Sequence, residues 1–358
     1  VLAGIFLGLT GYTYLAARIF PIPLALSLLP LLFSRRYARL RWRQLALFAG
    51  AGLIVLLPLI IYFVDHPESF WVRIGQVGPS STSLATLADS YWRSLRMLFL
   101  VGDPYWRFNL PDQPVFNWFW GGLLIVGWLF ALVRWFRQPA DWQRSACLLL
   151  TLAPLFMLLP TALATTEIVP SNLRAIGLIP FVYYLPALGM ILLVESLWRS
   201  LMRLVRRWSD PESRQPLLAR FQTRLPVVFG AIVMLTLIFG SVAVVDAYFG
   251  KWSSRADVFY DTDSDLVAIS QYLDDQDLAE ETIFMAALHY RHPTVAFMSD
   301  RYEQVKWLPQ SQALAIPAEG PALYLFPHNS PLPEWAAPYL PAEPYAVGPE
   351  GPDAEPLY

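Results

Sequence analysis

Residues 44–63 read QLALFAGAGLIVLLPLIIYF, a run of twenty positions without a charged side chain. A helix of that length crosses the hydrocarbon core of a bilayer, which is about 30 Å thick. The ten residues before it, SRRYARLRWR at 34–43, hold five arginines and no acid. An apolar run beside a short basic connection predicts a membrane span that is preceded by a cytoplasmic loop.

Similar apolar runs recur along the chain as far as Phe249. The composition agrees, because 56% of the 358 residues are hydrophobic and only 15% are charged, whereas soluble domains are about one quarter charged. We therefore predict a polytopic α-helical membrane protein with about six full spans, in which Val1–Thr10 is the truncated end of a first helix whose upstream neighbours are missing. The full spans are expected at Leu15–Phe33, Gln44–Phe63, Trp118–Phe136, Ser145–Ala164, Ala175–Trp198 and Leu225–Phe249.

Charge alternates between successive connections and predicts their side of the membrane. Residues 34–43, 134–144 and 199–224 together hold fifteen basic residues, whereas the much longer remainder, 65–117, 165–174 and 250–358, holds ten. Cytoplasmic loops are enriched in Arg and Lys, so we expect the second set to face outward from a multi-pass protein of the plasma (cytoplasmic) membrane. The formal net charge of −2 indicates no nucleic-acid partner.

The composition becomes that of a soluble domain after Phe249. We expect a transmembrane domain at 1–249 with an outward loop at 65–117, and an extracytoplasmic domain at 250–358. Within the latter, the pattern predicts a helix at Asp263–Leu273 and a loose, proline-rich end from Pro331. Short apolar runs predict strands of a small α/β layer, at Thr282–Ala287, Thr294–Met298, Ala313–Ile316 and Ala322–Phe326.

Cysteine and histidine usage predicts no disulfide and no metal site. Cys147 is the single cysteine, which excludes an intrachain disulfide. His289, His292 and His328 lie in the tail without an accompanying set of carboxylates or thiolates, so we read them as ordinary loop histidines.

The first candidate site lies near the outward end of the opening helices, where residues 8–21 read GLTGYTYLAARIFP. Arg18 with Tyr12 and Tyr14 offers a planar fork of donors and two phenols, which suit a phosphate. A snorkelling arginine beside two interfacial tyrosines explains the same residues equally well.

The second candidate lies in the long outward loop, where residues 102–114 read GDPYWRFNLPDQP. Asp103, Arg107 and Asn109 stand among aromatic residues, and these are the groups that bind sugars. On the residues alone, a turn held by an Asp103–Arg107 pair is the favoured reading. The length of loop 65–117 favours a function, and within it we expect a flexible start at Ser80–Ser83 and an amphipathic helix at Asp89–Arg96.

The third candidate is the outward connection 165–175, which reads TTEIVPSNLRA. Arg174 at the mouth of a span could hold a phosphate, with Asn172 beside it. Pairing of Arg174 with Glu167 is at least as well supported by the sequence.

The ordered set GLTGYTYLAARIFP, GDPYWRFNLPDQP and PSNLRAIGLIP, placed between spans in this topology, resembles the membrane glycosyltransferases of the C superfamily. It is most similar to bacterial relatives of the dolichyl-phosphate-mannose–protein mannosyltransferases, over roughly Val1–Leu193. The resemblance implies a hexosyl- or pentosyltransferase that moves a sugar from a polyprenyl-phosphate donor in the membrane to a protein, lipid or glycan acceptor on the outer face.

The resemblance also implies roles for the candidate residues. Arg18, Arg174, Tyr12 and Tyr14 would bind the donor phosphate, and Asp103, Arg107, Asn109, Glu167 and Asn172 would line the cavity or meet the acceptor. The general base would lie upstream of Val1, so the catalytic residue is unknown and we expect this fragment alone to be inactive. A divalent metal is implied only by the resemblance, and the residues themselves indicate no cofactor.

The alternative function is a multi-spanning transporter or flippase of an anionic or lipid-linked substrate. Such a protein is expected to carry charged or broken helices near the bilayer midplane. The predicted spans hold almost no charge except Glu195, which lies near a cytoplasmic end. A noncatalytic membrane scaffold that displays the tail is a third alternative, and an acid pair in the first outward loop would favour the enzyme over both.

Overall fold

The computed structural model describes residues 1–33, 38–77, 83–138, 140–208, 211–278, 280–288, 290–310, 312–340 and 350–354. Parts of several predicted segments lie outside the described residues: 34–37, 139 and 209–210 of the basic connections, 80–82 of the flexible loop start, His289, and 341–349 with 355–358 of the proline-rich end. The chain forms two compact units, Val1–Thr236 and Leu237–Tyr358. The division falls inside helix α10, so the last turns of that helix belong to the second unit.

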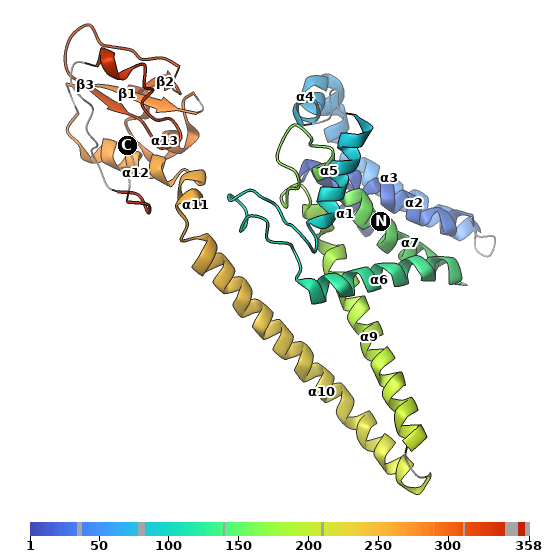
Figure 1. Ribbon diagram of the computed structural model, residues 1–358. Helices are drawn as coiled ribbons and strands as arrows, with labels where there is room; N and C mark the ends of the chain where they lie inside the picture. Colours follow the sequence, from blue (N-terminus) through green and yellow to red (C-terminus); the bar gives the residue numbers. More distant parts are fainter. Residues whose placement is uncertain are drawn as a thin grey trace. The chain divides into compact units, whose positions relative to one another are not determined.

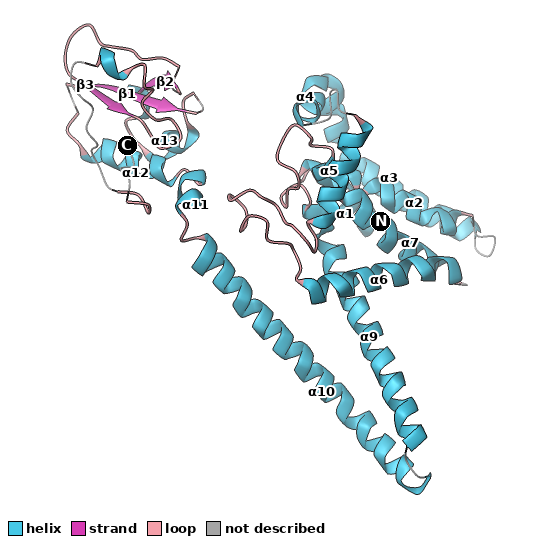
Figure 2. Cartoon of the chain, viewed as in Figure 1, coloured by secondary structure: helices cyan, strands magenta, loops and turns pink. Residues whose placement is uncertain are grey.

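The first unit is helical (Figures 1 and 2). Its longer helices are separated by short 3₁₀ helices at Leu15–Ile19 and Ile176–Leu178, which lie beside the candidate motifs. The α-helices are α1 (Leu2–Thr10), α2 (Pro21–Leu32), α3 (Ala38–Asp65), α4 (Pro67–Val77), α5 (Leu84–Arg96), α6 (Trp118–Arg137), α7 (Asp141–Met157), α8 (Leu159–Ala162), α9 (Ile179–Trp208) and α10 (Pro211–Val245).

In the described residues, six segments are long and apolar enough to cross a membrane. Apolar side chains on them face outward from the protein: Ile54 is 73% exposed and Leu53 is 58% exposed. Side chains of this kind are buried in a water-soluble protein of ordinary composition. The six segments match the predicted full spans closely, at Leu15–Leu32, Trp42–Asp65, Trp118–Arg137, Asp141–Ala162, Ile176–Leu204 and Val227–Trp252.

Glycines set the close approach of two helix pairs. A Cβ atom on Gly127 of α6 would lie 2.0 Å from the Leu185 carbonyl oxygen of α9, and one on Gly189 of α9 would lie 2.1 Å from the Leu123 carbonyl oxygen. Gly4 and Phe48 bring α1 and α3 together in the same way. Small residues therefore let these backbones touch, as they do between membrane helices.

A buried apolar cluster lies where α5, α6, α7 and α9 meet. Met97, Met157, Leu158 and Leu185 are each at most 1% exposed within it, and Phe20 packs against it from the start of α2. The loops that contain the candidate motifs are connected to the helices of this cluster.

The second unit holds a three-stranded parallel sheet of order β2-β1-β3. The central strand β1 (Thr282–Ala287) is buried along most of its length. Its neighbours are β2 (Lys306–Pro309) and β3 (Ala322–Leu325), with Phe284 opposite Lys306 and opposite Tyr324. After α10 the chain passes through a π-helix (Asp246–Trp252), α11 (Ala256–Asp261), α12 (Ser264–Asp275) and, between β1 and β2, α13 (Pro293–Met298).

Helix α12 and strands β1 and β3 confirm three predicted elements, whereas two predicted strands are wrong. Residues Thr294–Met298 form the helix α13, because the His292 ring nitrogen Nδ1 accepts a hydrogen bond from the Thr294 amide and Pro293 opens the first turn. Residues Ala313–Ile316 are an irregular segment. The second edge strand is instead β2, which the apolar pattern did not identify.

Candidate functional site

In the second motif, residues 102–114, the chain folds back tightly on itself. The Val115 amide donates to the Met97 carbonyl at 3.1 Å, and the Gly102 amide donates to the Asp112 carbonyl at 2.9 Å. A Cβ atom on Gly102 would lie 1.9 Å from the Gln113 carbonyl oxygen, so only glycine fits where the two arms cross. The crossing of the backbone therefore requires glycine at the first position of the motif.

Asp103 is the centre of the site and is fully buried. Its Oδ1 accepts a hydrogen bond from the Tyr105 amide at 2.9 Å, and its Oδ2 accepts one from the Asn172 amide at 2.8 Å. Burial raises the pKa of the Asp103 carboxyl, while these two amides and the positive charge of Arg174 act to lower it. Asp103 thus ties the loop between α5 and α6 to the connection before α9, 69 residues further along the chain.

Two amide side chains complete this link. Asn109 Nδ2 donates to the carbonyl oxygens of Asp103 and Leu110, at 2.8 Å each. Asn109 Oδ1 accepts a hydrogen bond from Asn172 Nδ2, also at 2.8 Å. Three of the residues singled out from the sequence, Asp103, Asn109 and Asn172, therefore form one hydrogen-bonded cluster.

Arg107 stands apart from that cluster. Its side chain is exposed, and the carboxylate of Asp103 is held by backbone amides instead. The turn pair between Asp103 and Arg107 that the sequence favoured is therefore wrong. Arg107 remains a cation on the surface of the loop.

Arg174 and Glu167 form the ion pair that the sequence left open. Arg174 also donates to the Ile168 carbonyl at 3.0 Å, so one guanidinium closes the turn that Glu167 and Ile168 begin. The two side chains are only 18% and 35% exposed. Their charges compensate one another across this turn.

Arg18 lies in a different environment, on the 3₁₀ helix Leu15–Ile19. Its guanidinium carbon stands 5.0 Å from the ring centre of Phe63 and 5.9 Å from that of Phe70. Its Nε is buried and has no hydrogen-bond partner in the described part of the chain. Arg18 is thus a cation beside aromatic faces, and it forms no ion pair with a carboxylate among the described residues.

The two tyrosines of the first motif do not converge on Arg18 through any hydrogen bond between described residues. The Tyr12 hydroxyl donates to the Val55 carbonyl of α3 at 2.8 Å. Tyr14 is 41% exposed, and its carbonyl accepts from the Ala17 amide at the start of the 3₁₀ helix. Tyr12 therefore fastens the motif to α3.

Contacts in the first unit link the first motif to the third and the second motif to the third. The 3₁₀ helix that carries Arg18 contacts the 3₁₀ helix Ile176–Leu178, which follows Arg174. Phe20 and Phe181 support this contact, with ring centres 6.2 Å apart. The second and third motifs are joined by Asp103 and Asn172, as described above.

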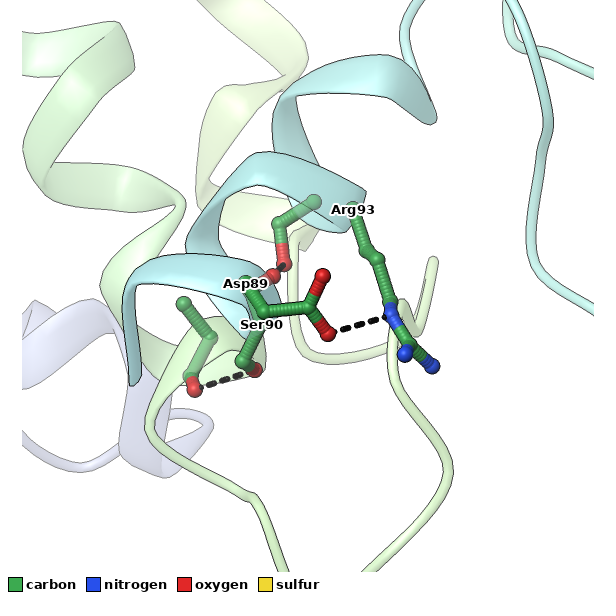
Figure 3. A network of polar contacts seen from close by, with 5 residues as sticks. Asp89, Ser90 and Arg93 are labelled. Carbon is green, nitrogen blue, oxygen red and sulfur yellow. Dashed lines mark hydrogen bonds and ion pairs between the residues drawn. The ribbon is translucent and has the colours of Figure 1, made fainter. Parts of the chain in front are cut away.

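Buried hydroxyl groups on α5, which sequence reasoning missed, hold the same unit together. Ser90 donates to the Ala162 carbonyl at the end of α8 at 2.6 Å, and Ser94 donates to the Ser90 carbonyl at 2.8 Å. Figure 3 shows Ser90 beside the ion pair of Asp89 and Arg93, which is on the exposed side of α5. The available signal was the amphipathic spacing of α5, in which Ser90 and Ser94 fall four residues apart on one face.

Among the described residues, no group of three or more His, Cys, Asp and Glu side chains could hold a metal ion. The arrangement instead offers two kinds of chemistry. The Asp103 cluster is a set of hydrogen bonds that fixes loop geometry, and Arg18, which has no carboxylate partner in the described residues, is a cation suited to an anion. No protein-family profile, curated protein sequence or solved structure matches this chain.

Proposed function

We propose that the chain is part of an integral membrane glycosyltransferase, which moves a sugar from a polyprenyl-phosphate donor to an acceptor on the outer face of the membrane. The six apolar segments span the bilayer in this proposal, with basic connections in the cytoplasm and the terminal domain outside. The observation that supports it is that three motifs, distant in sequence, are linked by contacts in the helical unit, and that one of them carries Arg18, which forms no ion pair with a carboxylate among the described residues.

In this proposal the cations and the carboxylates of the candidate motifs have different tasks. Arg18 would bind the phosphate of the donor, because no acid among the described residues pairs with it and its aromatic surroundings strengthen electrostatic attraction. Arg174 would contribute less, since Glu167 already compensates its charge. Asp103 would act by holding the loops in place, because both carboxylate oxygens already accept backbone hydrogen bonds.

The test is sugar transfer by the full-length protein in vesicles that contain a sugar linked to polyprenyl phosphate. We expect Arg18→Ala to lower the rate of transfer at least about tenfold, because it removes a cation from the departing phosphate. The matched control is Arg93→Ala, which removes an exposed arginine paired to Asp89 and is expected to change the rate less than about twofold.

Two results would overturn the proposal. Equal rates of sugar transfer for Arg18→Ala and the unaltered protein would show that Arg18 does not bind the donor phosphate. Movement of the donor across the vesicle membrane without any sugar transfer would support a flippase instead.

A further inference from the structure

The second unit follows its apolar helix after a very short connection. The π-helix that continues α10 ends at Trp252, and α11 begins at Ala256. The intervening Ser253–Arg255 can separate these two elements by at most about 15 Å even when extended. If Val227–Trp252 spans the bilayer, as the proposed function requires, the terminal domain is held at the membrane surface.

The chain enters this domain at the edge of the sheet where the carboxyl ends of the parallel strands lie. Tyr260 of α11 stacks on His328, which follows β3, with ring centres 3.7 Å apart. At the start of α12, Asp263 accepts a hydrogen bond from the Thr294 hydroxyl at 3.4 Å, and Thr294 follows β1. The short connection Ser253–Arg255 and α11 therefore lead to the edge at which the parallel strands end. Figure 1 shows α11 between the end of α10 and α12.

The segment that leaves β1 at this same edge exposes large apolar side chains. Leu288 is 52% exposed, Tyr290 is 72% exposed and Phe297 on α13 is 89% exposed. Val295 of the same short helix is fully buried in the core, so Phe297, two positions later, points away from the core. A well-packed helix thus presents a phenylalanine outward.

The presenting loop is held in place by contacts of its own. Arg291 pairs with Glu303 at 2.7 Å, and its guanidinium lies 5.0 Å from the ring centre of Tyr302. This pair also neutralises the positive charge beside Tyr290. The segment therefore presents apolar and aromatic groups with little net charge.

We propose that Leu288, Tyr290 and Phe297 dock the terminal domain onto the lipid bilayer surface, with their side chains in the headgroup and upper acyl region. Aromatic rings favour that region, and apolar side chains partition into it from water. Since Glu303 compensates Arg291, the attraction is apolar, and it is independent of salt and of anionic lipid. This proposal rests on the proposed function only through the membrane insertion of α10.

The test uses the full chain in phosphatidylcholine vesicles, with Cys147→Ala to remove the single cysteine. A fluorophore is attached at Phe297→Cys or Tyr290→Cys and quenched by nitroxide groups on the lipid. The matched control is Glu280→Cys, an exposed position in the connection from α12 to β1, at the edge where the strands begin. We expect at least about twofold stronger quenching at 297 and 290 than at 280, unchanged in high salt.

Equal quenching at positions 297 and 280 would overturn the docking proposal. So would a probe at 297 that is shielded from water but not quenched by lipid, since a protein partner or a second copy would then cover this surface. Vesicle flotation separates this failure from that of the proposed function, because a chain that does not float with vesicles contradicts both. Sugar transfer without quenching contradicts docking alone.

Discussion

Replacing Asp103 by asparagine is expected to destabilise the first unit, although the two side chains have nearly the same shape. The carboxylate accepts two backbone amides, from Tyr105 and Asn172. Asparagine has one acceptor oxygen and an amide nitrogen that only donates. One of the two backbone amides must therefore lose its partner and face another donor.

The magnitude follows from two opposing effects. A hydrogen bond to a charged group contributes about 1.5–3 kcal/mol to stability. Against this, a neutral amide is easier to bury than a carboxylate, and the raised pKa of Asp103 shows that burial penalises its charge. We expect a net loss of about 1–2 kcal/mol at neutral pH, which lowers the melting temperature by roughly 2–8 °C for a unit of this size.

The measurement is thermal unfolding of the purified protein in detergent. Asp112→Asn is the matched control, because Asp112 is exposed in the same loop. Its backbone adopts a φ of 60°, which asparagine tolerates as aspartate does. This control is expected to stay within about 0.5 kcal/mol of the unaltered protein.

The pH dependence of the Asp103 effect has a definite sign. Because the folded pKa is raised above the ordinary value of 3.8, the folded state takes up a proton before the unfolded state does. The proton-linked part of the stability that Asp103 contributes is therefore complete below pH 3.8 and is lost as the pH rises through the folded pKa, whereas the hydrogen-bond contribution at neutral pH remains. The gap between the unaltered protein and Asp103→Asn should widen on acidification, and a gap that narrows, or two variants that melt alike, would refute the reasoning.

Two further predictions concern packing and charge elsewhere in the chain. Gly127→Ala in α6 is expected to lower the melting temperature, at a cost of about 1–3 kcal/mol from overpacking against α9. The control is Gly122→Ala on the same helix, where the new side chain meets no atom within 4 Å and should be neutral or slightly stabilising. Equal melting temperatures of the two variants would contradict the contact between α6 and α9. In the second unit, burial first and the charge of Asp263 next raise the pKa of Asp265 above 3.8, so the contribution of Asp265 to the stability of this unit should increase as the pH falls through its folded pKa. Asp265→Asn should abolish that contribution, as measured by hydrogen exchange of β1, and an unchanged pH profile would disprove it.

The helices that resemble membrane spans were predictable because a single property defines them. Twenty consecutive apolar residues are visible in the sequence whatever the rest of the chain does. Helix α5 was predictable for a similar reason, since its apolar side chains recur at helical spacing. In both cases the signal is local, and its period matches the structure that it specifies.

The terminal sheet shows where such local signals fail. Residues Thr294–Met298 are five positions that fit either a buried strand or one turn of helix. The choice was made by His292 and Pro293, which supply a cap and a first turn. Strand β2 has four residues, with Lys306 at one end and Pro309 at the other, and it is a strand because it pairs with β1, not because of its own composition.

The sequence predicted several residues of the candidate site, but it did not predict the hydrogen bonds between them. Residue types alone placed Asp103, Asn109 and Asn172 among the polar residues of interest. The contact between Asp103 and the Asn172 amide joins positions 69 residues apart, and no spacing rule reaches that far. The local alternative, a pair of Asp103 with Arg107, failed because Gly102 lets the chain cross itself and turns the carboxylate inward.

The buried carboxylate of Asp103 and the guanidinium of Arg18 have different surroundings in the described part of the chain, and different effects of substitution are therefore expected. Asp103 has no free lone-pair direction toward solvent, because it is fully buried and both oxygens hold backbone amides. Arg18 has an unpartnered nitrogen and aromatic neighbours in the described part of the chain. Substitution at Asp103 should therefore lower activity and stability together, whereas substitution at Arg18 should lower activity while the protein still melts as before. A variant of Arg18 that lost both in proportion would mean that its stacking on Phe63 matters for folding rather than for an anion.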